Sequence, residues 1–392
     1  MQDLPQTSPT RLSNLSDAAG KTIGRPLKVR VGHVEDYEQI AALQTRNNFT
    51  ALTCKEWTAL WEGNPACKHL GGQWPIGWVL ETHNRQIVGW IGNIHSAFRY
   101  RGRSLRAVTA WSWLVEAAHR GHGMLLVNRF LRQSGVDLFI CTNVSPVSEP
   151  FVKRLGFSRV PRGDWRKSGF WVTNFRGFTQ FALRSKHLPR TPVLTYPMST
   201  ILFCRQLYHA RLRASSHVAK LELCSEFDGR FDDFWEQLHH QNENVLLADR
   251  TRATLTWHFR IPRLQQNLWI LAVCKGSRLV AYAIFDRQDN PATGLRRVRL
   301  VDFQSLMGSE DSIRTTLSWM LKKCREDGIH VLEVNGCWLN RPELPRVTPP
   351  FCRTLASWQY YYKAGNTPGL NEVLKDPQVW SPSAFDGDIS LF

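Results

Sequence analysis

The sequence lacks any long apolar run, and no stretch approaches the roughly 18 residues that a membrane-spanning helix requires. The first 26 residues are polar, include Asp3 and Asp17, and contain no hydrophobic segment of the kind a secretory signal needs. We therefore expect no transmembrane segment, and a flexible polar tail over residues 1–26.

Paired cysteines are also missing. The nine cysteines stand singly, without CxxC pairs and without the His/Cys spacing of a metal site. This usage is typical of reduced thiols, so the sequence predicts a cytoplasmic protein without a disulfide framework and without a metal.

Acidic residues are scarce relative to basic ones: 33 Asp and Glu face 50 Lys and Arg, which gives a net charge of +17. Such an excess indicates an anionic partner, which is a nucleic acid, a membrane surface or a phosphorylated ligand. No basic tail concentrates the charge, although local groups occur at 205–213 and 297–299. A solvated basic surface therefore stays open as the simpler interpretation.

Tryptophan, by contrast, is abundant, with 16 residues. Stacking on bases or sugar rings is one use for these side chains, and core packing with a few residues at a cleft wall is the better-supported one. Strand periodicity places Trp111 and Trp113 on the same face, where both would line one wall.

The length of 392 residues favours two domains, and 43% hydrophobic residues suffice for packed cores. An internal repeat supports this division. Residues 78–91, "WVLETHNRQIVGWI", and 270–283, "ILAVCKGSRLVAYA", both predict a β-hairpin. In each copy a strand, a helix and another strand follow, and the offset stays near 190 residues. The sequence therefore predicts a mixed α/β (α+β) fold in two similar halves.

The two copies differ after the third strand. The first has "HRGHGMLLVNRFL" from residue 119, whereas the second has "LMGSEDSIRTTLSWML" from 306, where Ser309 or Asp311 is expected to cap a helix. Between the copies, residues 186–200 carry three prolines and predict a linker.

The turn Arg120-Gly121-His122-Gly123 lies where an apolar strand meets a helix. Helix N-termini expose N–H groups and the positive end of the helix dipole, and therefore bind anions. Glycines let the backbone approach a phosphate closely, and arginine offers a fork that matches phosphate oxygens. The alternative is an ordinary strand–turn–helix connection with a solvated arginine.

The order of hairpin, strand, basic turn, helix, strand and helix resembles the GNAT superfamily of acyl-CoA-dependent transferases. The resemblance covers residues 27–185 and is carried by "WSWLVEAAHRGHGMLL" (111–126), "DLFICTNVS" (137–145) and "EPFVKRLGFSRV" (149–160). Leu125 departs from the family pattern, which has a small residue there. The segment "EWTALWEGNPACK" (56–68) also resembles the start of tandem GNAT-like proteins associated with bacterial cell-surface polysaccharide genes.

This resemblance implies two tandem GNAT-like domains: residues 27–185 bind acyl-CoA, 186–215 are a linker, and 216–392 form a second domain with a degenerate turn. The co-substrate would be acetyl-CoA or another acyl-CoA. The main chain of Leu114 and Val115 would bind the pantetheine arm. The diphosphate would be held by the turn residues, which are Arg120, Gly121, His122, Gly123, Met124 and Leu125.

Catalysis of acyl transfer requires orientation of two substrates and removal of a proton from the nucleophile. Glu116, directly after the strand, and His95 are the candidate bases. The tyrosine that many relatives use as acid is replaced by Val152, so Ser145 and Ser148 are the candidate proton donors. Each candidate also has a structural interpretation. Glu116 would be a charge in a solvent-facing loop, and His95 would be a structural histidine. The two serines would cap a helix.

The acceptor is expected to be a small molecule with an amine or hydroxyl group, such as a sugar or glycan precursor, with the second domain shaping its site. Two other functions stay open. A Fem-type transferase would take an aminoacyl group from tRNA, which suits the basic charge. A non-catalytic GNAT-like binding module would explain Leu125 and the missing tyrosine.

Overall fold

The computed structural model describes residues 27–68, 74–144, 146–209, 220–336, 348–355, 359–388 and 390–391. The tail expected over residues 1–26 lies outside these ranges. Contacts divide the chain into two compact units. The N-terminal unit comprises Gln2–Ser96 and Arg106–Phe139, and the C-terminal unit comprises Met1, Ala97–Leu105 and Ile140–Phe392. The domain limits expected from the sequence stay predictions.

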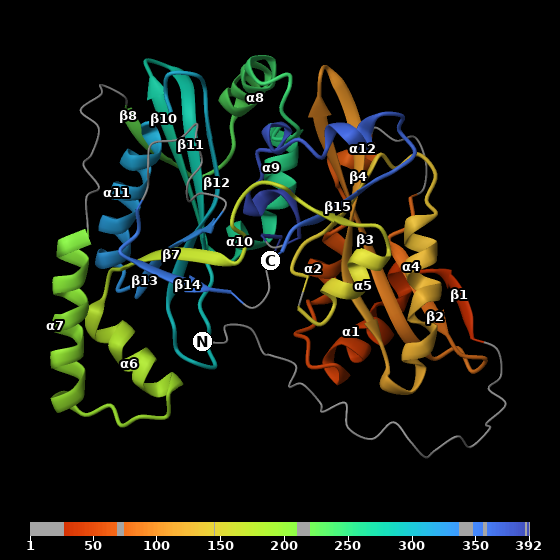
Figure 1. The fold of residues 1–392 in the computed structure, drawn as a ribbon, viewed down its shortest axis with the longest axis horizontal. Coiled ribbons are helices and arrows are strands. Elements are labelled where there is room, and N and C mark those ends of the chain that lie inside the picture. The colour runs from red at the N-terminus through yellow and green to blue at the C-terminus, as the bar shows by residue number, and fades with distance from the viewer. Residues whose placement is uncertain are drawn as a thin grey trace. The chain divides into compact units, whose positions relative to one another are not determined.

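The N-terminal unit is built on five strands in the order β1-β2-β3-β4-β5 (Figure 1). Strand β2 pairs antiparallel with β1 and with β3, so the hairpin predicted over 78–91 is confirmed. Helices α1 and α2 cover one face of the sheet and α4 covers the other (Figure 1). The elements that lie wholly or partly in this unit are β1 (Lys28–Val31), η1 (Val34–Asp36), α1 (Tyr37–Arg46), α2 (Cys54–Ala59), α3 (Pro65–Lys68), β2 (Gly77–Glu81), β3 (Ile87–Tyr100), β4 (Arg103–Val115), η2 (Ala117–His122), α4 (Gly123–Leu131) and β5 (Leu138–Cys141).

Tryptophans fill the space between α2 and the sheet of the N-terminal unit. The rings of Trp57 and Trp61 lie 4.7 Å apart, and both approach Trp90 on β3. Trp57 and Trp90 are fully buried. Core packing is therefore confirmed as the main use of these aromatic side chains.

The C-terminal unit contains a seven-stranded sheet in the order β14-β7-β13-β12-β11-β10-β8. Strands β10 and β11 form the second predicted hairpin. Among the described residues of this sheet, β12 and β13 are the one pair of neighbouring strands that run parallel. Helices α8 and α11 cover opposite faces (Figure 1). The main elements are α5 (Glu149–Arg154), β6 (Ser158–Arg159), β7 (Lys167–Val172), α6 (Phe175–Ser185), α7 (Pro192–His209), β8 (Lys220–Cys224), α8 (Gly229–Gln241), β9 (Leu247–Ala248), α9 (Arg252–His258), α10 (Arg260–Leu264), β10 (Leu268–Lys275), β11 (Arg278–Arg287), β12 (Arg297–Ser305), α11 (Ser312–Glu326), β13 (Val331–Asn335), β14 (Phe351–Thr354), β15 (Tyr361–Ala364) and α12 (Leu370–Val373). Two short 3-10 turns, η4 (Pro377–Val379) and η5 (Ala384–Asp386), end the chain.

Strand β7 lies within residues 27–185, which the sequence assigns to the first domain. In the structure it belongs to the seven-stranded sheet of the C-terminal unit. It pairs antiparallel with β13 on one side and with β14 on the other. Helices α6 and α7 follow, and Val172 of β7, Phe181 of α6 and Val331 of β13 share one buried cluster. A helix thus occupies 192–209 within the segment expected as a linker, and residues 210–215 lie outside the described part of the chain.

Part of the basic charge is buried in the second sheet. Arg297 and Arg299 on β12 are at most 7% exposed, and Arg299 Nε lies 2.6 Å from Glu333 Oε2 on β13. These two arginines therefore add no charge to a solvated basic surface, because a buried carboxylate holds their guanidinium groups in the sheet.

The repeat is visible in single backbone hydrogen bonds. The residue after β4, Glu116, donates its N–H to the carbonyl of Val88 on β3 at 2.9 Å. In the second copy, Leu306 follows β12 and donates to Val280 on β11, also at 2.9 Å. Glu116 therefore corresponds to Leu306, and the two copies share the geometry of hairpin, third strand and turn.

Candidate functional site

The end of β4 is bent by a residue in an unusual conformation. Ser112 has a φ of 53°, in the left-handed region that few non-glycine residues adopt. Trp111 is 7% exposed and packs on Trp61, whereas Trp113 is 36% exposed and lies against Gly123 at the start of α4. The expectation that Trp111 and Trp113 share one face is wrong, because the left-handed residue between them interrupts the alternation.

The basic turn lies on the surface of the N-terminal unit, between β4 and α4. Arg120, Gly121 and His122 are exposed, and Gly123 is buried against Trp113. A Cβ atom added at Gly121 would meet nothing within 4 Å. The space beside Gly121 is therefore open to a ligand, not filled by the protein.

Helix α4 begins at Gly123 and runs for nine residues. Its N-cap, His122, makes no side-chain capping hydrogen bond, and the first turn contains no acidic residue. The first N–H groups of an α-helix have no partner within the helix and carry partial positive charge. This end of α4 therefore has the charge that suits an anion, and binding of a diphosphate there stays a prediction.

The other residues assigned to the acyl-CoA have different environments. Leu114 is buried on β4, and Val115 approaches Gly89 of β3 and Gly123. Met124 is half-buried, and Leu125, the departure from the family pattern, is 42% exposed. The structure thus brings β4 and the turn together, and the roles of these residues stay predictions.

Glu116 does not stand alone at the end of β4. Its Oε1 accepts hydrogen bonds from Arg46 Nη2 at 2.6 Å and from Arg46 Nε at 3.1 Å. The Glu116 side chain is 24% exposed, and Arg46 is the last residue of α1. The sequence analysis missed Arg46, because no local signal joins residues that are 70 positions apart.

His95 lies inside the N-terminal unit, at 3% exposure. Its Nε2 is 3.1 Å from Asn93 Nδ2, its ring meets the Trp74 ring edge-on, and Asn64 donates to its carbonyl. Burial lowers the pKa of His95 to about 4, so the imidazole is neutral at pH 7. Asn93 continues the network to Gln133, again through paired amides.

The two candidate proton donors are not brought to the turn by any described contact. Ser145 lies outside the described residues, and Ser148 precedes α5 in the C-terminal unit, at the N-cap position without a side-chain capping bond. Next to it, Glu149 accepts a hydrogen bond from Tyr361 at 2.7 Å. Tyr361 is fully buried, so this tyrosine, which sequence reasoning missed, anchors α5.

A basic pocket of about 900 Å³ lies beside α4 in the N-terminal unit. Four residues of α4 and its end line it at helical spacing, which the sequence could have revealed as one face. They are Leu125, Asn128, Arg129 and Arg132. The remaining wall is formed by β1, by the end of β2 and by the turn that follows β2, and includes Lys28, Glu81, His83 and Arg85.

The second copy has a pocket of about 700 Å³ at the end of β12, with different chemistry. Amide and hydroxyl side chains, Gln241, Gln304 and Ser305 among them, line it together with Met307 and Glu310. The helix that follows, α11, has Asp311 at its N-cap position, as expected from the sequence, although its side chain makes no capping hydrogen bond.

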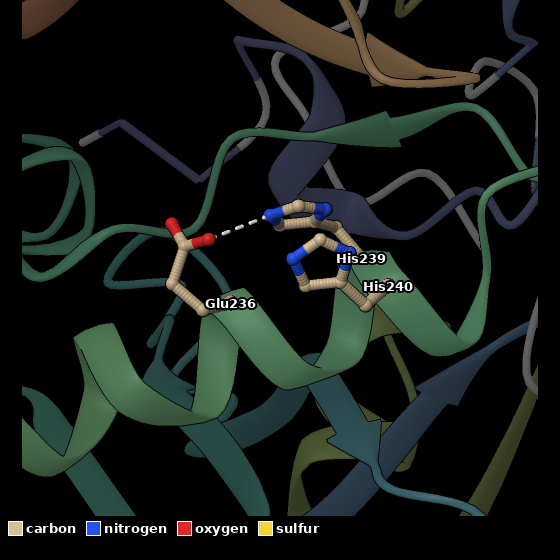
Figure 2. A group of neighbouring side chains, drawn as sticks. All are labelled: Glu236, His239 and His240. Carbon is tan, nitrogen blue, oxygen red and sulfur yellow. Dashed lines mark hydrogen bonds and ion pairs between the residues drawn. The ribbon is translucent and has the colours of Figure 1, made fainter.

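Three side chains on α8 of the C-terminal unit form a group that could hold a metal ion, although the sequence predicted none. Figure 2 shows Glu236 and His239 facing each other, with His240 beside them. Glu236 Oε2 and His239 Nε2 are 2.8 Å apart, and the ligand atoms of all three lie within 4.8 Å of one another. Glu236 and His240 are exposed on the helix surface.

Comparisons with known proteins find similarity in structure alone. No family model and no curated protein matches the sequence. Among solved structures, a GCN5-related N-acetyltransferase from Kribbella flavida aligns with a TM-score of 0.53 and 10% identity, over 87% of this chain and 72% of that one. A GCN5-related N-acetyltransferase from Anabaena variabilis gives 0.51 and 10%, over 86% and 73%.

Saccharomyces cerevisiae N-myristoyltransferase, solved with bound myristoyl-CoA, aligns with a TM-score of 0.50 and 12% identity, over 86% of this chain and 80% of that one. Identities this low establish architecture and not chemistry. The chain therefore has a GNAT-like fold with two mixed sheets, and the alignments extend over most of its length.

Proposed function

We propose that the protein is an acyl-CoA-dependent acyltransferase whose basic turn binds the diphosphate of the donor, acetyl-CoA or another acyl-CoA. The observation that carries the proposal is the exposed turn Arg120–Gly123, with open space at Gly121 and the uncapped start of α4 behind it. Main-chain N–H groups of the turn bind the diphosphate oxygens, and Arg120 adds charge. Leu114 and Val115 hold the pantetheine arm through their main chain.

In the reaction, an amine or hydroxyl of the acceptor attacks the thioester carbonyl. A C–N or C–O bond forms, the C–S bond breaks, and the coenzyme A thiolate leaves and takes up a proton. Glu116 accepts the proton of the nucleophile, directly or through water. We prefer it to His95 because Glu116 is partly exposed at the end of β4, whereas His95 is buried among amides. Ser145 and Ser148 stay the candidate proton donors.

The acceptor is a small molecule, and a sugar or a cell-surface polysaccharide precursor fits the amide-lined pocket of the second copy. We place the reaction in the cytoplasm, which agrees with eight described cysteines that are all unpaired. The alternatives are a Fem-type transferase that uses aminoacyl-tRNA and a non-catalytic module. The anion-binding turn favours the acyl-CoA enzyme over both.

Titration calorimetry with acetyl-CoA tests the donor site. Gly121→Asp places a carboxylate where the protein leaves space, so we expect at least a 100-fold loss of affinity through repulsion of the diphosphate. Gly229→Asp is the matched control, because a Cβ there also meets nothing within 4 Å, and Gly229 lies at the start of α8, away from the basic turn. Equal affinity in Gly121→Asp and the wild type would place the donor elsewhere.

The alternatives give different results in the same preparation. Salt-sensitive binding of tRNA without binding of acyl-CoA would favour the Fem-type transferase. Binding of acyl-CoA with no release of free thiol across a panel of amino sugars, sugars and amines would favour the non-catalytic module. Thiol release that depends on one of these acceptors supports the transferase.

A further inference from the structure

Helix α7 packs on α6 and β7 of the C-terminal unit with a largely polar side (Figure 1). Thr195 and Gln206 on this side are at most 7% exposed. Val172 N of β7 donates to Gln206 Oε1 at 2.8 Å, and Gln206 Nε2 donates to Val172 O at 2.9 Å. Ser199 Oγ lies 3.0 Å from Thr179 Oγ1 on α6. An ordinary surface helix buries its apolar side, whereas α7 turns polar side chains toward its own fold.

The apolar side chains of α7 face outward instead. Seven large ones are at least 38% exposed, and the three most exposed are Val193 at 80%, Ile201 at 66% and Leu207 at 62%. Val193 and Leu207 are separated by about four helical turns of 3.6 residues, so they lie on one line along the helix. The same spacing places Thr195 and Gln206 on the opposite side. A contiguous exposed apolar surface marks a site of interaction, so we expect an apolar partner to cover this side of α7.

Positive charge surrounds the apolar face of α7. Residues 165–221 contain ten lysines and arginines and no aspartate or glutamate, so this segment carries +10 of the net charge of +17. The Arg176 guanidinium lies over the Tyr196 ring, 5.5 Å from its centre, which brings a cation next to an exposed aromatic side chain of α7. The exposed cations on and around α6 and α7 are Arg176, Arg184, Lys186, Arg190 and Arg205.

We infer that α7 docks on the surface of an anionic lipid bilayer. Its apolar side chains enter the boundary between headgroups and acyl chains, and the surrounding lysines and arginines contact the lipid phosphates. The 18 residues of α7 extend for about 27 Å, at 1.5 Å per residue. The helix lies along the bilayer because α6 and β7 occupy its polar side. This inference does not rest on the proposed function, which places the acyl donor in the N-terminal unit.

Charge favours a lipid surface over a second copy of the chain. Two copies that met across α7 would bring two sets of cations together, and residues 165–221 of neither copy supply a carboxylate to pair with them. Such contacts between like charges disfavour association. An anionic bilayer supplies an apolar layer and negative charge together, and it therefore matches both features of this surface.

Flotation with phosphatidylcholine vesicles that contain about one third phosphatidylglycerol tests the apolar contact. We expect the wild type to float with these vesicles. Ile201→Gln/Leu207→Gln removes two exposed apolar side chains and keeps good helix formers, so partitioning should fall about tenfold at an unchanged melting temperature. Leu223→Gln/Leu264→Gln is the matched control, because these leucines are 56% and 73% exposed on β8 and α10. It should float as the wild type does.

Charge variants test the headgroup contact. Lys186→Gln/Arg190→Gln should weaken partitioning to the anionic vesicles at least tenfold, since each cation near an anionic surface contributes severalfold. The difference from the wild type should shrink as salt is added, because salt screens exposed charges. Lys55→Gln/Lys375→Gln removes two exposed lysines outside residues 165–221 and should change partitioning less than twofold.

A fluorescent label identifies the surface that meets the lipid. Cys204 is an exposed free thiol on α7. In a Cys54→Ser/Cys337→Ser/Cys352→Ser background, a nitrobenzoxadiazole label on Cys204 should emit at a shorter wavelength when the anionic vesicles are added, because the dye leaves water. Unchanged emission from vesicle-bound protein would place the lipid contact elsewhere and overturn the inference.

Other results would also overturn docking on lipid. Flotation of Ile201→Gln/Leu207→Gln at the wild-type level would reduce the binding to unspecific attraction of a basic protein. A wild type that floats with no vesicle and sediments as a dimer, which the same variant converts to a monomer, would assign the face to a second copy. A monomeric wild type that binds no vesicle would leave the face to an acidic partner protein. Binding of acetyl-CoA is measured separately, so none of these results decides the proposed function.

Discussion

After their third strands, the two copies of the repeat continue with the same backbone hydrogen bonds. In the first copy His119 N donates to Glu116 O at 2.9 Å, and in the second Ser309 N donates to Leu306 O at 3.0 Å. The offset between these pairs is about 190 residues, as in the hairpins. The copies can therefore be compared residue by residue through the turn.

The next equivalent hydrogen bond shows that residues of opposite charge occupy the same position in the two copies. Gly123 N donates to Arg120 O, and Ile313 N donates to Glu310 O at 3.3 Å, so Arg120 corresponds to Glu310. By the same offset, Gly121 corresponds to Asp311. Where the first copy has an arginine and a glycine, the second has two carboxylates.

The second turn also uses one of these carboxylates internally. Glu310 Oε1 accepts a hydrogen bond from Gly308 N at 3.0 Å, and Asp311 lies 3.8 Å from Arg314 in the first turn of α11. Negative side chains at this end of a helix stabilise it and repel an anionic ligand. One scaffold thus carries a turn with basic side chains and a turn with acidic ones, so under the proposed function the side chains, and not the fold, decide which turn takes the diphosphate.

The largest effect is expected at the residue that follows the third strand. Glu116→Gln removes the proposed base and keeps the size of the side chain, so we expect kcat to fall about 100-fold or more, with the affinity for acetyl-CoA unchanged. Steady-state kinetics and calorimetry separate these two quantities. Glu326→Gln, at an exposed carboxylate on α11 of the second copy, is the control and should retain full kcat. An unchanged kcat in Glu116→Gln would remove the catalytic difference between the copies.

Charge reversal at the turns tests the comparison directly. Arg120→Glu gives the first turn the charge of the second, and the loss of charge-assisted hydrogen bonds together with new repulsion should weaken acetyl-CoA binding roughly 50-fold. Glu310→Arg makes the opposite exchange in the second copy and should leave this affinity unchanged. Calorimetric titration of the two variants measures both effects. If Glu310→Arg weakened binding as much as Arg120→Glu, the copies would not differ in the way their charges indicate.

The sequence predicted those features that depend on local pattern and composition. Both hairpins, the helix after the basic turn and the mixed α/β class follow from periodicity and from the repeat, and all are confirmed. The bend at Ser112 was not predictable, because a left-handed residue in a strand depends on the pairing of that strand with its neighbours. It changed the environment of Trp113.

Features that join distant segments were also beyond the sequence. The pattern of β7 specifies a strand but not its partners, and it pairs with β13 and β14. Two ion pairs depend on the same kind of long-range contact. One joins Glu116 to Arg46, and the other joins the buried Arg299 to Glu333. The basic pocket could have been found in part, since Arg129 and Arg132 share helical spacing with Leu125.

The smallest expected effect concerns a property that the two units share. Burial lowers the pKa of His95 in the N-terminal unit to about 4 and that of His258 in the C-terminal unit to about 3. A histidine whose pKa is lower in the folded state stabilises the fold above its unfolded pKa of about 6.5. This stability is lost as the pH falls toward the folded value, because the unfolded chain binds the proton first.

Removal of one such histidine should therefore flatten the pH dependence of stability. Between pH 7 and pH 5 the titration of His95 lowers the free energy of unfolding by about 2 kcal/mol. His95→Asn should lose this part of the slope whatever its stability at pH 7, and urea denaturation followed by tryptophan fluorescence measures it. His83→Asn, at an exposed histidine, is the control and should keep the wild-type slope. An unchanged slope in His95→Asn would mean that His95 takes up protons in the folded state, which would restore it as a competitor of Glu116 for the role of base.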